Sequence, residues 1–435
     1  MRYLSTRGGQ ETSLVDAVMR GLAADGGLFV PDELPRFDPQ TLRGNSFAEI
    51  ASEVLAPFFA GSGLESELDT ICHDAFDFPL PLTPLLAEGA ELSVLELFHG
   101  PTAAFKDVGA RFLAALMERA LERSADSRPL TILVATSGDT GGAVAAAFHR
   151  RAGIRVGVLF PKGQVSLRQQ HQLTCWGDNI RAFEVDGAFD DCQALVKQAF
   201  TDPALQHRHR LSAANSINIG RLMPQVAYHA AASLWHWRRH GTTAGSIVPS
   251  GNLGNGMACM WARAMGLPVR ELVLAVNANR TIPDYLATGQ WQPRPSVTTL
   301  ASAMDVGNPS NMERLRDLVP DYATLRASVE AYTVDDASIR RQIAQDYARY
   351  GRAWCPHTAT AFCVYDQLPT ARKTGRAWIV SATAHPAKFE TIVEPIIGRP
   401  VPVPPALQEL LERPTASTAL RPRLADFREA LDSWN

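Results

Sequence analysis

The sequence contains 435 residues, of which 46% are hydrophobic, and its 42 Lys and Arg residues against 45 Asp and Glu residues give a net charge of −3. A chain of this length exceeds what one hydrophobic core usually serves, so we expect two or three globular domains. The near-neutral charge argues against a general affinity for nucleic acid or for an anionic membrane. No apolar run reaches the roughly 18 residues of a membrane span, and the amino terminus has no signal-peptide pattern, so we expect a soluble cytoplasmic protein.

The six cysteines and eleven histidines show no disulfide or metal-binding pattern. No two cysteines have CxxC spacing, and the pairs His207/His209 and His236/His240 lack companion Cys, Asp or Glu residues in a ligand pattern. A chain this long does not need disulfides for stability. We therefore expect reduced thiols and no metal.

Residues 1–90 are expected to form an amino-terminal domain with one strand, helices such as 47–59 and proline-bounded loops. From residue 91, short apolar runs alternate with helical stretches, which predicts an α/β fold of parallel sheets with crossover helices. The expected strands are 92–97, 130–135, 155–160, 180–185, 246–249, 271–277 and 377–381. The proline-dense segments 80–84 and 400–405 are expected to lie outside regular elements.

Lys106 follows the turn HGPTAAF at 99–105 and opens a predicted helix. Burial would lower the pKa of its amine, and only a neutral amine attacks an aldehyde carbon, so Lys106 is a candidate anchor for pyridoxal phosphate. The alternative is an ordinary helix lysine that reaches solvent. This segment alone favours that alternative, because buried lysines are rare.

Residues 131–147 read as a strand, a tight turn and an alanine-rich helix. The hydroxyls of Thr136, Ser137 and Thr140, together with the N–H groups at the start of the helix, predict a site for a carboxylate. The alternative is helix capping by Ser, Asp or Thr without any ligand.

Residues 246–258 read as a second apolar strand that enters a helix through the glycine-rich loop SGNLGNG. Glycines permit positive φ angles and a close backbone approach, so this loop predicts a phosphate cradle. It lacks the lysine of GxxxxGK[ST] and the spacing of GxGxxG, which argues against a nucleoside triphosphate or a dinucleotide. Because ligands of such sheets bind beyond the carboxyl ends of the strands, the three loops are expected to form one site.

These motifs give the chain a resemblance to the threonine synthases, a family of fold-type II pyridoxal phosphate enzymes related to tryptophan synthase β chains, cysteine synthases and serine/threonine dehydratases. The resemblance covers most of the chain. The segments that carry it are 1–8, 25–31, 99–107, 135–141, 215–221, 251–255, 303–311 and 381–388. The first, second and seventh of these segments are typical of threonine synthases, so they carry the substrate assignment.

The resemblance implies two parallel-sheet, three-layer α/β domains in addition to the amino-terminal domain at 1–90. The large domain would comprise 91–106 and 216–435, and a small mobile domain would comprise 107–215. The cofactor, pyridoxal 5′-phosphate, would lie between these two domains. We expect a monomer or a weak homodimer.

The resemblance also implies residue roles around the cofactor. Lys106 would hold the cofactor and, once released by substrate, would move protons at Cα, Cβ and Cγ. Asp139 lies where many relatives have an asparagine that bonds the 3′ oxygen of the cofactor, but an aspartate cannot donate a hydrogen bond unless it is protonated. Gly251, Asn252, Leu253, Gly254 and Asn255 would wrap the cofactor phosphate. Thr383, or its near competitor Ser381, would face the pyridine nitrogen.

Substrate-binding candidates are small polar or basic residues near these loops. They are Thr136, Ser137, Thr140, Asn215, Ser216, Asn218 and Arg221, with Lys162 and Arg168 as weaker candidates for the substrate phosphate. For the run 215–221 the alternative is a capped helix with an exposed arginine. The polar segment 303–311 is expected to be a functional loop near the site.

The implied reaction converts O-phospho-L-homoserine and water to L-threonine and phosphate by γ-elimination and then β-addition, the last step of threonine biosynthesis. The alternatives are a pyridoxal phosphate-dependent serine/threonine dehydratase, a phospho-lyase acting on the same phosphoester, or a non-catalytic relative. Retention of Lys106 and of the loop glycines argues against a non-catalytic relative.

Overall fold

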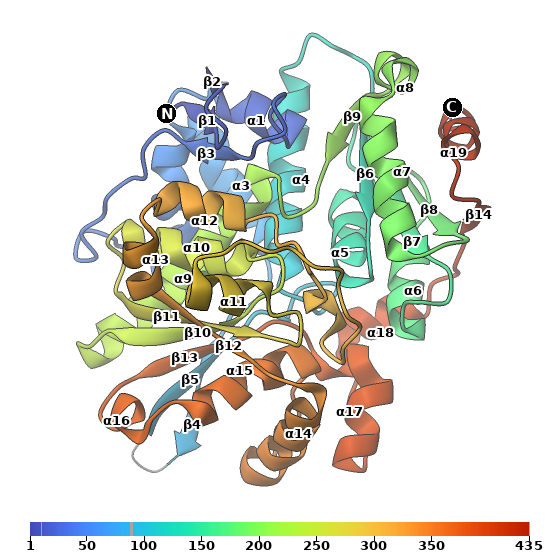
Figure 1. The fold of residues 1–435 in the computed structure, drawn as a ribbon. Helices are drawn as coiled ribbons and strands as arrows, with labels where there is room; N and C mark the ends of the chain where they lie inside the picture. Colours follow the sequence, from blue (N-terminus) through green and yellow to red (C-terminus); the bar gives the residue numbers. More distant parts are fainter. Residues whose placement is uncertain (10, 88–89, 435) are drawn as a thin grey trace.

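The computed structural model describes residues 1–9, 11–87 and 90–434. Two sheets built mainly of parallel strands lie next to each other, and a small domain formed by the first part of the chain lies beside both (Figure 1). The α/β class expected from the alternation of strands and helices is confirmed.

The larger sheet has six strands in the order β12-β11-β10-β13-β5-β4. Its strands are β4 (Leu82–Ala87), β5 (Ala90–Glu96), β10 (Ala244–Pro249), β11 (Val269–Val276), β12 (Val329–Thr333) and β13 (Trp378–Ala382). All neighbouring pairs are parallel except β4 and β5, which run antiparallel. The expectation that 80–84 lies outside regular elements was wrong, because Pro84 belongs to β4. Strand β4 is at the edge of the sheet, where a missing N–H group costs no ladder hydrogen bond.

The smaller sheet has five parallel strands in the order β14-β8-β7-β6-β9. They are β6 (Leu130–Ala135), β7 (Ile154–Pro161), β8 (Ile180–Val185), β9 (Arg210–Ala213) and β14 (Thr418–Leu420). Strand β14 pairs with β8, and the following helix α19 (Leu424–Asp432) packs on α7 (Phe189–Thr201). The carboxyl-terminal segment therefore returns to the sheet formed by residues 130–213.

All seven strands expected from the sequence are present, within a few residues of the expected bounds. The amino-terminal part adds a three-stranded antiparallel sheet of β1 (Tyr3–Ser5), β2 (Glu11–Thr12) and β3 (Phe29–Pro31). Its helices are α1 (Leu14–Arg20), α2 (Phe47–Leu55) and α3 (Leu68–Ala75). Helix α2 begins at a capping box of Ser46 and Glu49, and the chain continues as a 3-10 turn at Ala56–Phe59, where Pro57 follows the last α-helical turn.

The remaining helices lie around the two sheets (Figure 1). They are α4 (Lys106–Glu122), α5 (Asp139–Phe148), α6 (Leu167–Thr174), α8 (Pro203–Arg208), α9 (Ile219–His240), α10 (Gly254–Ala264), α11 (Thr281–Thr288), α12 (Met312–Leu318), α13 (Tyr322–Ser328), α14 (Asp336–Tyr350), α15 (Pro356–Gln367), α16 (Thr370–Lys373), α17 (Glu390–Ile397) and α18 (Pro405–Leu411). Short 3-10 turns lie at Glu65–Glu67, at Ser302–Met304 and at η4 (Pro386–Phe389). Helix α18 begins at Pro405, where a proline in the first turn loses no intrahelical bond.

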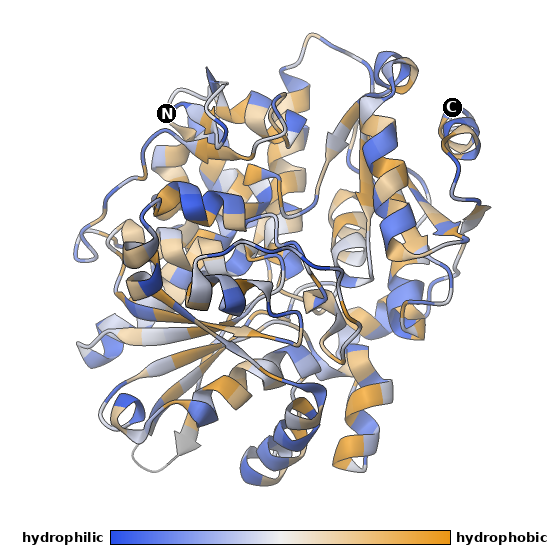
Figure 2. Cartoon of the chain, viewed as in Figure 1, coloured by the Kyte–Doolittle hydropathy of each residue, from blue (hydrophilic) through white to orange (hydrophobic). Residues whose placement is uncertain are grey.

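Two long central helices hold the parts of the molecule together. Helix α4 packs on α3, α5 and α9, and α9 packs on α2 and α10. Hydrophobic residues gather in the strands and in these inner helices, whereas α14 carries many hydrophilic residues (Figure 2). The packing fixes the amino ends of α4, α5, α9 and α10 relative to one another, and these ends surround the cavity described below.

Two further observations concern the described part of the chain as a whole. None of its helices combines the length and the apolar character needed to cross a bilayer. All six cysteines are buried and unpaired, and the described residues contain no cluster of His, Cys, Asp and Glu suited to a metal ion.

Candidate active site

A cavity of about 460 Å³ lies at the carboxyl ends of strands from both sheets. It is lined by the β6–α5 turn, by the β10–α10 loop, by the start of α4 and by the run before α9. The three loops predicted from the sequence therefore meet at one place. The segment 302–308 and Ser310 also line the cavity, so the prediction that 303–311 forms a loop near the site is confirmed.

Lys106 is the first residue of α4 and projects into this cavity. The turn before it is fixed by Asp107, whose carboxylate accepts hydrogen bonds from the Thr102 backbone N–H at 2.9 Å and from the Thr102 hydroxyl at 2.6 Å. A side chain at Gly100 would collide with Asp107, and Ala103 takes a left-handed φ of 54°. The HGPTAAF turn is thus folded around its own aspartate, and it directs the lysine inwards.

The Lys106 side chain is only 14% exposed. This burial lowers the pKa of its amine to about 8; the charge of Asp139 opposes that shift, and the charges of Lys388 and Arg221 add to it. A lysine with this pKa has a substantial neutral fraction near neutral pH, which ordinary surface lysines lack. The prediction that Lys106 is buried is confirmed, and its role as a nucleophile stays a prediction.

Asp139 is the first residue of α5 and is almost fully buried. Burial alone would raise the pKa of its carboxyl group, but Lys388 and Lys106 together hold that pKa well below its usual range. Its nearest cation is Lys388, with Nζ 2.8 Å from Oδ1, whereas Lys106 Nζ lies 4.0 Å from Oδ2. An ionised Asp139 can accept hydrogen bonds but cannot donate one.

The β10–α10 loop differs in one respect from the expectation that its glycines adopt positive φ. None of its glycines does so, and the left-handed position is Leu253, with a φ of 63°. Gly251 is needed for space, because a Cβ there would lie 2.6 Å from Met304 Cα. At Gly254 a Cβ would meet only Asn311, Ser216 and Gln225 side chains, at 3.6 Å or more.

A Cβ at Gly254 would thus be in ordinary contact with its neighbours, and Gly254 itself lines the cavity. The first N–H groups of α10 lie at this point, and such groups have no intrahelical acceptor. The loop around them is braced by side chains: Asn255 accepts from the Ser250 hydroxyl at 2.7 Å and donates to the Pro249 carbonyl oxygen at 2.7 Å. This arrangement suits a phosphate group.

A second group of buried donors lies beside Lys106. Arg221, on α9, is 3% exposed and donates through Nη1 to the Ala214 carbonyl oxygen, but its Nε has no partner. Burial lowers the pKa of its guanidinium to about 10, with Asp107 opposing that shift, so the group remains a cation at neutral pH. The Asn215 side-chain oxygen is also buried without a partner. The alternative of an exposed arginine on a capped helix is wrong, because Arg221 is buried and lines the cavity.

Three of the predicted substrate-binding residues are placed differently from expectation. Asn218 caps α9: its side chain donates to the Val18 and Ala213 carbonyl oxygens and accepts from the Gly220 N–H, and it does not line the cavity. Arg168 donates to the Ala387 carbonyl oxygen and lies 3.6 Å from Glu390. Lys162 is exposed. Neither basic residue lines the cavity.

The β6–α5 turn combines capping with an open face. The Thr136 hydroxyl accepts hydrogen bonds from the Gly138 and Gly141 N–H groups at 3.0 and 2.9 Å. Thr136 therefore caps the start of α5, which was the alternative to carboxylate binding. Ser137 and Thr140 line the same cavity and remain candidates for a carboxylate. Thr383 also lines the cavity, whereas its competitor Ser381 is buried in β13 away from it.

Two functional candidates were not predicted from the sequence. His357, at the start of α15, lines the cavity, accepts from the Ala303 N–H at 3.0 Å, and has an unpartnered buried Nδ1. Burial lowers the pKa of its imidazole to about 4, so it is neutral. Lys388 is fully buried behind Asp139. His357 lies outside the segments that carry the resemblance; Lys388 ends the segment 381–388, but nothing in the sequence indicates that it contacts Asp139.

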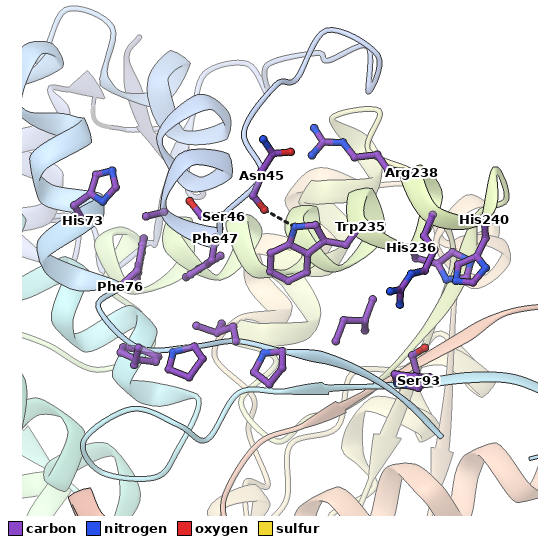
Figure 3. Close-up of a pocket in the computed structure, with 18 residues that line it drawn as sticks. Asn45, Ser46, Phe47, His73, Phe76, Ser93, Trp235, His236, Arg238 and His240 are labelled. Atoms are coloured by element: carbon purple, nitrogen blue, oxygen red, sulfur yellow. Dashed lines mark hydrogen bonds between the residues drawn. The ribbon is translucent and has the colours of Figure 1, made fainter. Parts of the chain in front are cut away.

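A larger hollow of about 1230 Å³ lies elsewhere, between the amino-terminal helices, strands β4 and β5, and the end of α9 (Figure 3). Prolines and aromatic side chains form much of its wall, and Trp235 donates to the Asn45 carbonyl oxygen at 2.8 Å. Its basic side chains are His73, His236, Arg238, Arg239 and His240, and the described residues that line it include no Lys, Asp or Glu. It contains none of the predicted site residues, so we assign the chemistry to the smaller cavity.

Two parallel α/β sheets with a buried lysine, a phosphate-suited loop and a hydroxyl-rich turn at their junction are the features of a fold-type II pyridoxal phosphate enzyme. Residues 78–382 match the family model described as pyridoxal-phosphate dependent enzyme, and the chain is an enzyme of this class. Residues 2–76 and 358–430 match models described as threonine synthase N terminus and threonine synthase, C-terminal.

Known proteins identify the family more closely. Threonine synthase from Serratia marcescens is 39% identical over 428 residues, which cover 97% of this chain and 96% of that protein. The crystal structure of threonine synthase from Escherichia coli superposes with a TM-score of 0.90 at 35% identity over all of both chains. The structure of pyridoxal phosphate-bound threonine synthase from Brucella melitensis gives a TM-score of 0.90 at 34% identity, over 100% of this chain and 99% of that one. The chain belongs to the threonine synthase family.

Proposed function

We propose that this chain converts O-phospho-L-homoserine and water to L-threonine and phosphate. The observation that carries this proposal is the pairing of two anion-suited positions in one cavity, the first N–H groups of α10 at Gly254 and the buried cation Arg221. A cofactor phosphate and a substrate phosphate require two such positions. A dehydratase of unphosphorylated serine or threonine would need only the first.

The residues of the cavity fit pyridoxal phosphate in charge and in size. A cavity of about 460 Å³ falls within the range of cofactor and small-ligand sites. We assign the cofactor phosphate to the backbone of Gly251, Asn252, Leu253, Gly254 and Asn255, and the pyridine nitrogen to the Thr383 hydroxyl. When bound, the cofactor withdraws electrons from the substrate carbon that carries the amine, which makes neighbouring protons removable.

Lys106 both holds the cofactor and moves protons in this proposal. Its amine titrates near pH 8, so it can accept a proton from carbon and return it at a neighbouring position. Cα and Cβ must each lose a proton before the phosphate leaves with the electron pair of the Cγ–O bond; Cγ then gains a proton, Cβ gains the hydroxyl of water, and Cα regains a proton. One amine can serve several adjacent carbons if they share one face of the substrate.

The substrate is oriented by groups on two sides of Lys106. Arg221, Asn215 and Ser216 would bind its phosphate, since all three line the cavity and a guanidinium cation is a strong donor to phosphate. Ser137 and Thr140, at the amino end of α5, would bind its carboxylate. Asp139 is assigned to the cofactor, beside the ring, as an acceptor only.

The test is turnover of O-phospho-L-homoserine in ¹⁸O-labelled water. We expect unlabelled phosphate and threonine that carries the label in its hydroxyl, because the Cγ–O bond breaks and solvent adds at Cβ. A phosphatase would put the label in phosphate and release homoserine. A phospho-lyase would release 2-oxobutanoate and ammonia, and either of these results would contradict the proposal.

A further inference from the structure

A second lysine is buried beside Lys106, and the proposed chemistry does not use it. Lys388 lies in η4, has no exposed surface, and donates to the Asp139 carboxylate and to the Thr102 carbonyl oxygen, both at 2.8 Å. Burying an ammonium group is costly, and the cost is offset only when such partners are present. Lys388 does not line the cavity, so it is placed to act on Asp139 rather than on a ligand.

The Asp139 carboxylate is turned towards Lys388. Oδ1 accepts from Lys388 and from Gln169 Nε2, the latter at 3.2 Å, whereas Oδ2 lies 4.0 Å from Lys106 Nζ, beyond hydrogen-bond range. A buried carboxylate with no other cation near it would pair with Lys106 and hold a proton on that amine. Lys388 supplies the other cation.

We propose that Lys388 is a positioning residue that keeps Asp139 ionised and hydrogen-bonded away from Lys106, so that the Lys106 amine has no hydrogen bond to that carboxylate and stays nucleophilic. This inference rests on the proposed function only in taking Lys106 as the nucleophile. It extends that function by giving Lys388 a part in preparing the amine.

The surroundings of η4 keep Lys388 in place. Its carbonyl acceptor, Thr102, also accepts from Gln172 on α6 at 3.2 Å, and Arg168 on the same helix donates to the carbonyl oxygen of Ala387, the residue before Lys388. Helix α6 therefore braces both the lysine and the turn that carries Lys106. A lysine held from several sides cannot swing to share its ammonium group with solvent.

The other charged groups facing Lys106 do not replace Lys388. Arg221 on α9 is a cation that lacks contact with Asp139, and His357 on α15 is neutral because burial lowers its pKa. Asp107 on α4 is engaged by Thr102. Asp139 and Lys388 therefore form the charge pair nearest the amine, and removing only the cation leaves Asp139 to pair with Lys106.

The test measures the amine directly in the cofactor-free protein. Full-length wild type and Lys388→Met are labelled with acetic anhydride across a pH series, and acetylation of the Lys106 peptide is quantified by mass spectrometry. Removing a nearby positive charge favours the protonated form of Lys106, so its labelling midpoint should rise by about one pH unit from the wild-type value. Near about pH 7.5 that shift reduces the neutral fraction, and with it the labelling rate, roughly eightfold.

Two further variants separate positioning from a merely structural role. Lys388→Arg keeps the charge and should keep the wild-type midpoint. In Asp139→Asn/Lys388→Met both charges are gone, and the midpoint should not rise, because the carboxylate through which Lys388 acts is absent. Lys162 is exposed and serves as an internal control whose labelling stays unchanged.

An unchanged or lowered Lys106 midpoint in folded Lys388→Met would overturn the inference, and so would an equal rise in the double variant. If Lys388→Met does not fold, the double variant and Lys388→Arg still test the inference. It predicts that neither has a Lys106 midpoint above the wild-type value, and a higher midpoint in either variant would overturn it. This readout requires neither cofactor nor substrate. If the protein does not make threonine, the proposed reaction is wrong, but the labelling result remains valid.

Discussion

Replacing Arg221 tests where the substrate phosphate binds. Arg221 is 3% exposed, remains a cation and lines the cavity, and its buried Nε has no hydrogen-bond partner. We expect Arg221→Gln to lower kcat/KM for O-phospho-L-homoserine while the visible absorbance of the bound cofactor stays unchanged, because the proposed partner of Arg221 belongs to the substrate. Arg221→Lys should recover part of the loss, since lysine supplies the charge without the planar fork.

The magnitude follows from the contacts of Arg221. One of its N–H groups donates to the Ala214 carbonyl oxygen, and we take the loss of a single charge-assisted hydrogen bond to the substrate as the expected effect. Such a bond contributes about 1.5–3 kcal/mol, which corresponds to a loss of roughly 10- to 150-fold in kcat/KM. The affinity of Arg221→Gln for inorganic phosphate, measured by competitive inhibition, should fall in the same proportion.

The assay is steady-state phosphate release, with absorbance spectra and thermal unfolding of each variant as checks on cofactor binding and folding. Arg238→Gln is the matched control, because Arg238 lies on the same helix and donates to the Leu42 and Gly44 carbonyl oxygens outside the cavity. It should leave kcat/KM unchanged. An unchanged kcat/KM in folded Arg221→Gln would refute the assignment, and loss of cofactor instead would move Arg221 to the cofactor phosphate.

Two other residues give separate tests. In a spectroscopic titration, Gly254→Val should weaken cofactor binding roughly 10- to 150-fold, which corresponds to the loss of one charged hydrogen bond. The control Gly177→Val, whose Cβ would meet nothing within 4 Å, should bind the cofactor as the wild type does. Wild-type affinity in Gly254→Val would mean that the cofactor phosphate binds elsewhere. Asp305→Ala should speed hydrogen exchange in 296–306 and lower kcat/KM about tenfold. Asp305 accepts hydrogen bonds from Asn277 and from the Thr299 hydroxyl and N–H. In the variant, each of these groups that is left buried without a partner costs about 1–3 kcal/mol. Unchanged exchange would mean that Asp305 does not hold this loop.

Local patterns in the sequence were enough to locate the main parts of the site. Each predicted loop follows a short apolar strand and enters a helix, and the ends of parallel strands meet at one edge of a sheet. Lys106 could be proposed as the cofactor lysine because a turn rich in Gly, Pro and Thr precedes it and the other motifs lie around the same cavity. These inferences need only the order of strand, loop and helix.

Features that depend on distant contacts could not be predicted. The left-handed residue of the β10–α10 loop is Leu253 rather than a glycine, and hydrogen bonds of Asn255 with Ser250 and Pro249 hold the loop in that conformation. Lys388 is about 250 residues from Asp139 in sequence, and their contact exists only after both sheets are assembled. Asn218 looked like a ligand-binding side chain, but in the structure it caps a helix, and polar residues before helices serve both purposes.

The most direct test of the central claim identifies the lysine that binds the cofactor. The protein loaded with pyridoxal phosphate is reduced with sodium borohydride, digested, and analysed by mass spectrometry for the peptide that carries the cofactor. We predict that the label lies on Lys106, the buried lysine that opens α4 and projects into the cavity. A label on Lys388 or on any other lysine, with Lys106 unmodified, would contradict the assignment of the whole site.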